Sequence, residues 1–158
     1  MTKDDLDDLR LRLRRLEQIE QARNFLHTYA QTQDIPDPQR AAQLFREDGV
    51  LTTARGSVRG RAEIARFFAT AFAADTSDKR HYIVNPRTTW LEDGLVRIES
   101  YFLFVGRGDD SSRIGWGTYD DTIDVSGDRP CFATKTIELE VRTDLSEGWQ
   151  RVPGEGAA

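Results

Sequence analysis

Apolar residues recur every three to four positions along the first thirty residues, a spacing typical of one long amphipathic helix. They fall into two sets: Leu6, Leu9, Leu13 and Leu16 form the first, and Ile19, Ala22, Leu26 and Tyr29 form the second. At 3.6 residues per turn the two sets lie roughly 140° apart around the helix, so one core cannot easily bury both. We predict that the second set packs on a sheet of this domain. The first set, the leucine stripe, then meets either a partner protomer or, if the helix folds back, its own domain.

The segment Asp34-Ile-Pro-Asp-Pro38 ends this helix, because a residue that precedes proline is pushed towards an extended conformation. Asp37 can then cap a second helix that has a proline at its first position. This second helix is expected to end near Asp48-Gly49. A hairpin over residues 50–58 and a third amphipathic helix over residues 60–72 complete the N-terminal half.

The period of the pattern changes at His81, from that of helices to that of strands. Runs of strand length cover residues 81–91, 95–105, 113–125 and 131–142, with turn-forming Gly, Asp and Ser between them. Helices followed by consecutive strands indicate the α+β class with an antiparallel sheet. We therefore predict a cone-shaped fold, in which three N-terminal helices cover the concave face of a curved sheet. The expected parts are a helical extension over residues 1–18, the cone over residues 19–142 and a loose tail over residues 143–158.

Charge and cysteine content narrow the range of functions. The formal net charge of −5 at pH 7 argues against nucleic-acid binding, which needs a basic surface. No stretch approaches the roughly 20 apolar residues of a membrane span, and the N-terminus lacks the apolar segment of a secretory signal, so we expect a cytoplasmic protein. The single cysteine, Cys131, excludes an internal disulfide framework. One cysteine and two separated histidines do not make a zinc site, so no metal is expected.

His81 and Asp34 are the candidate pair for acid–base chemistry. His81 opens the first long strand, and Asp34 ends the first helix, where the helix dipole disfavours a negative charge. A histidine across a pocket would compensate that charge, and the carboxylate would fix its tautomer and stabilise the imidazolium that forms on proton abstraction. The alternatives are that His81 packs in its strand and that Asp34 caps a turn. The other histidine, His27, is expected at the surface or at an interface.

Six short segments carry a further signal: Tyr29–Asp34, Ala41–Phe45, Asp48, Gly60, His81–Asn85 and Gly117–Asp121. Together they resemble the SnoaL-like branch of the nuclear transport factor 2-like (NTF2-like) superfamily, and their pattern is closest to scytalone dehydratase and bile-acid 7α-dehydratase-like members. The resemblance implies the cone-shaped fold and proton abstraction from carbon without a metal or organic cofactor. His81 and Asp34 match the histidine and aspartate that perform this step in those enzymes. Tyr29 matches a tyrosine that lines the site.

Other residues are candidates for holding the substrate. They are Asn85, which follows His81 in its strand, Glu99 and Tyr101 on the next strand, and Tyr119 on the one after. Packing is the alternative role, since aromatic residues in strands commonly fill the core or pair across strands. The last strand departs from the family pattern, because Arg129–Lys135 stands where the family usually has a tryptophan and an arginine.

We therefore expect a cofactor-free lyase or isomerase of the dehydratase type. Its small-molecule substrate would be apolar and bear a carbonyl, with polycyclic and aromatic compounds among the candidates. Two alternatives stay open: a non-catalytic ligand-binding or assembly module, similar to the small subunit of a ring-hydroxylating dioxygenase, and a polyketide cyclase. The leucine stripe and the family's habit of dimerising favour a homodimer or a higher homo-oligomer.

Overall fold

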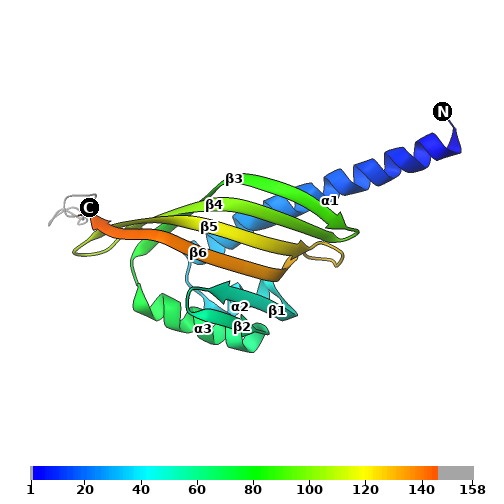
Figure 1. Cartoon of the computed structure of the whole chain (residues 1–158). Coiled ribbons are helices and arrows are strands. Elements are labelled where there is room, and N and C mark those ends of the chain that lie inside the picture. The colour runs from blue at the N-terminus through cyan, green and yellow to red at the C-terminus, as the bar shows by residue number, and fades with distance from the viewer. Residues whose placement is uncertain (1, 146–158) are drawn as a thin grey trace, which may run out of the picture.

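The structure, a computed structural model, describes residues 2–145 (Figure 1). The elements in chain order are α1 (Lys3–Asp34), α2 (Pro38–Gln43), β1 (Phe45–Thr53), β2 (Gly56–Arg59), α3 (Arg61–Ala74), β3 (Asp78–Glu92), β4 (Leu95–Arg107), β5 (Ser112–Asp124) and β6 (Cys131–Leu145). The predicted α+β class is confirmed, including the hairpin between the second and third helices.

Within the described range, all six strands belong to one curved sheet in the order β2-β1-β6-β5-β4-β3. Neighbouring strands are antiparallel except β1 and β6, which are parallel. The parallel pair arises because the chain leaves β2 through α3 to the far edge of the sheet and returns strand by strand until β6 lies beside β1. Helix α1 runs along β3 and β4, while α2 and α3 pack together beside β1 (Figure 1).

The core lies between the sheet and the helices. The second apolar set of α1 enters it as predicted, and Ala22, Leu26 and Tyr29 are 0%, 1% and 2% exposed. Along β4 every second residue from Val96 to Phe104 is buried, which is the alternation of a strand with one face in a core. The predicted packing of α1 on the sheet, with one buried face on each, is therefore present.

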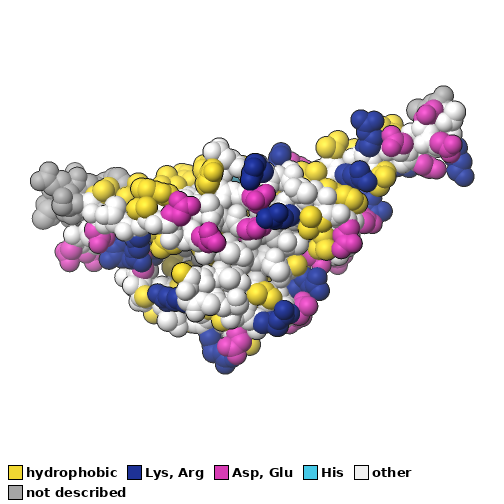
Figure 2. Space-filling view, in the orientation of Figure 1, with side chains coloured by type: hydrophobic (Ala, Val, Ile, Leu, Met, Phe, Trp, Pro, Cys, Tyr) yellow, Lys and Arg dark blue, Asp and Glu magenta, His cyan; other side chains and the backbone are white. Residues whose placement is uncertain are grey.

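The leucine stripe stays outside the core. Leu9, Leu13 and Leu16 are 55%, 54% and 64% exposed, and the N-terminal half of α1 projects beyond the sheet (Figure 1). Hydrophobic side chains are visible along this projecting part in Figure 2. The alternative in which the helix folds back on its own domain is therefore wrong.

None of the helices within residues 2–145 is both long enough and apolar enough to span a bilayer.

Several element boundaries differ from the prediction. Helix α2 ends at Gln43 rather than near Asp48-Gly49, because the backbone from Phe45 onwards pairs with β6. The amide of Phe132 donates to the carbonyl of Leu44 at 2.8 Å, which fixes this start of β1. At the other end of the chain, β6 continues to Leu145, into the segment expected to be loose. The rest of that segment lies outside the described residues.

A bulge in β3 changes which residues face the core. Asn85 has a positive φ of 54°, and the pairing with β4 shifts between Val84 and Arg87. An extra residue in one strand reverses the alternation beyond it. His81 and Ile83 are therefore half-buried on the inner face, whereas Asn85 and Arg87 are exposed on the outer face. Uninterrupted alternation would have placed Asn85 on the face of His81, and the bulge is the reason why this candidate ligand lies on the other face.

Candidate active site

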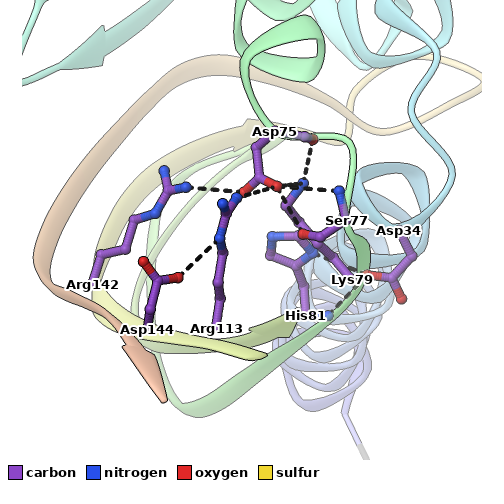
Figure 3. A network of polar contacts seen from close by, with 8 residues as sticks. All are labelled: Asp34, Asp75, Ser77, Lys79, His81, Arg113, Arg142 and Asp144. Atoms are coloured by element: carbon purple, nitrogen blue, oxygen red, sulfur yellow. Dashed lines mark hydrogen bonds and ion pairs between the residues drawn. The ribbon is translucent and has the colours of Figure 1, made fainter. Parts of the chain in front are cut away.

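The structure brings Asp34 and His81 into contact. Asp34 is the last residue of α1, and α1 lies along β3, whose inner face carries His81. The Oδ1 atom of Asp34 is 2.9 Å from the ring Nδ1 of His81 and accepts a second hydrogen bond, at 2.8 Å, from the backbone amide of His81. The two side chains are only 16% and 13% exposed. One carboxylate oxygen thus fixes both the backbone and the ring of the histidine (Figure 3).

This contact sets the protonation of the histidine. An ionised carboxylate only accepts hydrogen bonds, so Nδ1 of His81 must carry the proton and Nε2 keeps its lone pair. Burial lowers the pKa of His81; the hydrogen bond and the charge of Asp34 oppose this shift, and the Lys79 ammonium adds to it. The net direction is downward, so the imidazole is neutral at neutral pH. A neutral imidazole with a free Nε2 can accept a proton.

His81 forms part of the wall of a cavity of about 230 Å³ inside the curved sheet. Five phenylalanines contribute to the apolar part of this wall: Phe67, Phe68 and Phe72 from α3, and Phe102 and Phe104 from β4. The ring of Phe104 lies 5.7 Å from the imidazole of His81. Apolar walls of this kind exclude water and strengthen the polar interactions within the cavity.

Tyr29 and Tyr119 also line the cavity. Their rings meet edge to face at 5.9 Å, and burial raises the pKa of both phenols well above the usual value. Both side chains are therefore neutral and can donate a hydrogen bond. The ring of Tyr119 also stacks on Phe102 at 4.3 Å, which fixes its position in the wall.

A buried ion pair supports these two tyrosines. Lys135 and Asp121 are both fully buried, with 2.9 Å between Nζ and Oδ2, and their positions are paired across β6 and β5. Nζ of Lys135 also lies 3.5 Å from the ring centre of Tyr119 and 4.1 Å from that of Tyr29. The sequence pattern did not indicate this pair, although Lys135 belongs to the segment that departs from the family pattern.

A cluster of charges lies at one end of the cavity (Figure 3). Asp75, which follows α3, accepts hydrogen bonds from Ser77 and contacts the side chains of Lys79, Arg113 and Arg142. The sequence pattern did not indicate this cluster, because the strand pattern predicts a start at His81, whereas β3 begins at Asp78. With that start, Lys79 shares the inner face with His81 two residues later, as strand alternation requires.

The structure does not bring the remaining candidate ligands to this cavity. Asn85, Glu99 and Tyr101 lie together along a groove on the outer face of the sheet. Tyr101 is 56% exposed there, while its neighbours Ser100 and Phe102 are buried on the inner face. Of the four substrate-binding candidates, Tyr119 alone lines the cavity that contains His81. Among residues 2–145, the His, Cys, Asp and Glu side chains form no group of three that could hold a metal ion.

The sheet order and the helices on its concave face define an NTF2-like fold. A family model for the SnoaL-like domain matches residues 14–129. The chain therefore belongs to the SnoaL-like domain family. The comparison with curated proteins gives no match.

Three solved structures illustrate the similarity. A protein provisionally named scytalone dehydratase, from Novosphingobium aromaticivorans DSM 12444, is 18% identical with a TM-score of 0.72, covering 82% of this chain and 89% of that one. A type 2 hexachlorocyclohexane dehydrochlorinase is 17% identical with a TM-score of 0.72, covering 96% and 99%. The β subunit of the benzoate 1,2-dioxygenase from Burkholderia mallei ATCC 23344 is 17% identical with a TM-score of 0.66, covering 75% and 88%. At these identities the similarity shows a shared fold.

Proposed function

We propose that this protein is a cofactor-free lyase or isomerase that removes a proton from a carbon next to a carbonyl group. The observation that carries the proposal is the contact of His81 Nδ1 with buried Asp34, which leaves Nε2 unprotonated in a side chain that lines a cavity with phenylalanine walls. A general base needs an oriented neutral imidazole, and apolar walls beside it favour proton abstraction.

The residues around the cavity supply the parts of such a reaction. Nε2 of His81 takes the proton, and the electron pair of the broken C–H bond moves towards the carbonyl oxygen, which gives an enolate. Asp34 stabilises the imidazolium that forms, and the neutral phenol of Tyr29 or Tyr119 donates a hydrogen bond to the developing oxyanion. If a hydroxyl group is on the next carbon, the electrons return to expel it, a proton from the imidazolium or a tyrosine completes the water, and the result is elimination. If the proton returns to another carbon, the result is isomerisation.

The volume of the cavity bears on the size of the substrate. Pockets for drug-sized ligands usually measure about 300–1,000 Å³, and this cavity, at about 230 Å³, lies below that range. It therefore favours a substrate with a single ring over a polycyclic one. The five phenylalanines would hold that ring.

The names of two similar structures, a dehydratase and a dehydrochlorinase, describe elimination reactions and support the lyase reading. An assembly module is the second candidate, because the leucine stripe is exposed and a dioxygenase β subunit has the same fold. That candidate predicts stable co-purification with a larger subunit and no proton abstraction.

Proton exchange at carbon tests the proposal directly. We expect the protein, incubated in D2O with a panel of single-ring ketones and β-hydroxyketones, to accelerate deuterium incorporation next to the carbonyl or loss of water. NMR follows the exchange and mass spectrometry the product mass, which also separates elimination from isomerisation and from ring closure. If no panel member exchanges or eliminates faster than in buffer, the assembly reading replaces this proposal.

A further inference from the structure

The cavity contains a buried hydrogen-bond donor that has no acceptor. Gln33 is only 9% exposed and lines the cavity, and among the residues described its Nε2 atom has no hydrogen-bond partner. It follows Tyr29 by one helical turn and directly precedes Asp34, so α1 presents all three at the same end of the site. Buried donors in folded proteins are nearly always paired, and one that faces a cavity is suited to an acceptor on a ligand.

The same cavity has more positive than negative groups in its charge cluster. The single carboxylate of Asp75 lies 3.2 Å from Lys79 Nζ, 2.8 Å from an Arg113 nitrogen and 3.3 Å from an Arg142 nitrogen. Arg113 has a second carboxylate partner, Asp144, at 3.0 Å. Three cations therefore share two carboxylates, which leaves one positive charge in excess.

Two of these cations are placed to meet a ligand. Lys79 and Arg142 both line the cavity, together with Gln33 and His81. The Lys79 side chain is 15% exposed and that of Arg142 is 45% exposed, so Arg142 can still bind a further oxygen atom. Asp34 contacts the Nδ1 side of His81 and is not among the residues that line the cavity.

We propose that this end of the cavity binds a carboxylate group, and that the ligand is a monocarboxylic acid with one apolar ring. Lys79 and Arg142 pair with the carboxylate oxygens, Gln33 donates a hydrogen bond to the same group or to a ring carbonyl, and the phenylalanines hold the ring. Hydrogen bonds between charged partners are roughly twice as strong as those between neutral ones, so a carboxylate gains more here than a neutral amide. This subsite deepens the proposed function, on which it rests for the reaction but not for the binding.

Benzoate and benzamide are suitable probes because they have nearly the same shape and differ in charge. We expect the wild-type protein to bind benzoate at least about ten-fold more tightly than benzamide, as measured from shifts of the His81 imidazole signals in NMR titrations. The preference should disappear in Lys79→Gln combined with Arg142→Gln. Gln33→Leu should weaken binding of both probes. In the matched control, Arg87→Gln on the outer face of the same strand, the preference should stay unchanged.

Equal binding of the two probes, or a preference that survives in the double variant, would overturn the subsite. In that case the cluster serves only as a latch that ties the end of α3 to the sheet, and the double variant would lose thermal stability alone. The readout is binding without turnover, so its outcome is separate from that of the exchange assay. A protein that exchanges neutral ketones but does not prefer benzoate keeps the proposed function and loses the subsite.

An independent observation concerns the leucine stripe. Leu6, Leu9, Leu13 and Leu16 occupy the a and d positions of two heptads on the side of α1 that faces away from the core. The positions that flank them are Asp5, Arg10, Arg12 and Glu17. When two such helices pair in parallel, Asp5 meets Arg10 and Arg12 meets Glu17; in antiparallel pairing, Asp5 meets Arg12 and Arg10 meets Glu17. Every flanking contact joins opposite charges in either orientation.

We infer from this complementarity that the stripe binds the stripe of a second copy of the chain. Short isolated helices are marginal in water, but this one continues into turns that the core holds in place, so it needs no separate nucleation. Among residues 2–145, the charged partners of Arg10 and Arg12 are the exposed Asp7 and Asp8, at 3.1 Å and 3.8 Å. Exposed pairs of this kind are weak and can be exchanged for contacts between copies.

Light scattering on the full chain tests this interface. We expect the wild type to have a mass that is an even multiple of the chain, and Leu9→Gln combined with Leu13→Gln to halve that mass. Glutamine has nearly the helix propensity of leucine, so α1 should stay helical by circular dichroism. The matched control is Leu11→Gln, which is also exposed, at 45%, but lies on the opposite side of the helix. A monomeric wild type, or an unchanged mass in the double variant, would refute the interface.

Discussion

Replacing His81 by alanine should lower kcat/KM for carbon proton abstraction about 10²–10⁴-fold, the usual contribution of a positioned general base. The substrate is the most active member of the exchange panel. The loss should appear in kcat, because Nε2 acts on the proton in the transition state and contributes little to holding the ring among the phenylalanines. The matched control is His27→Ala, since His27 is exposed on α1. Full turnover in His81→Ala would remove His81 from the mechanism.

The pH profile distinguishes a base from a packing residue. Burial lowers the pKa of His81 below its usual value near 6.5, so kcat/KM should be constant at neutral pH and fall only as the pH drops below 6.5. Asp34 raises this pKa, so Asp34→Asn should move the acid limb to still lower pH and reduce the plateau. An acid limb that stays in place in Asp34→Asn would show that the two side chains are not coupled. The free energy of unfolding should depend on pH in the same direction. Below pH 6.5 the His81 side chain binds more protons in the unfolded chain than in the folded one. Its contribution to stability is therefore complete above that pH and decreases as the pH falls.

The contact between Asp34 and His81 was predictable because each residue is placed by a local signal. A proline-rich segment ends α1 at Asp34, and the change of hydrophobic period places His81 near the start of a strand. The helix dipole then supplies a reason for the two to meet. Neither step depends on knowing how any strand pairs with its neighbour.

The face of the residues that follow was not predictable, because nothing local determines it. The bulge at Asn85 involves no glycine, although its φ is positive, and it reverses the alternation for the rest of β3. On β4 the two faces look alike in sequence: Phe102 and Phe104 point inwards, whereas Tyr101 points outwards and is equally aromatic. When both faces of a strand carry apolar residues, hydrophobic alternation cannot choose between them. Glu99 and Tyr101 were therefore assigned to a cavity that they do not reach.

The contact between Asp121 and Lys135 was likewise not predictable, because it depends on the register of β5 against β6. The ladder between these strands shifts twice, and only the shifted register places Asp121 opposite Lys135. In the sequence the two residues are 14 positions apart, with a turn between them. Lys135, on the last strand, packs against the two tyrosines of the cavity wall. The segment that departs from the family pattern, residues 129–135, therefore contributes to the support of this wall.

Lys135→Met should destabilise the fold by about 3–5 kcal/mol, because it leaves the fully buried Asp121 without its partner. Burial raises the pKa of Asp121 to about 6, so the carboxyl group is ionised at neutral pH and the loss should be larger at pH 8 than at pH 5. Urea unfolding followed by tryptophan fluorescence measures the effect. The double variant Lys135→Met with Asp121→Leu should recover most of the loss, since well-packed apolar replacements of buried ion pairs are often neutral.

The neighbouring pair Arg97–Asp120 is the matched control for this measurement. It lies on the outer face of the same sheet, with 2.7 Å between its charged atoms and side chains that are 42% and 48% exposed. Solvent screens such a pair, so Arg97→Gln should change the free energy of unfolding far less than Lys135→Met. If Lys135→Met unfolds no more easily than Arg97→Gln, then Asp121 is already neutral when buried. The rings of Tyr29 and Tyr119 would in that case lie against an uncharged amine instead of an ammonium group.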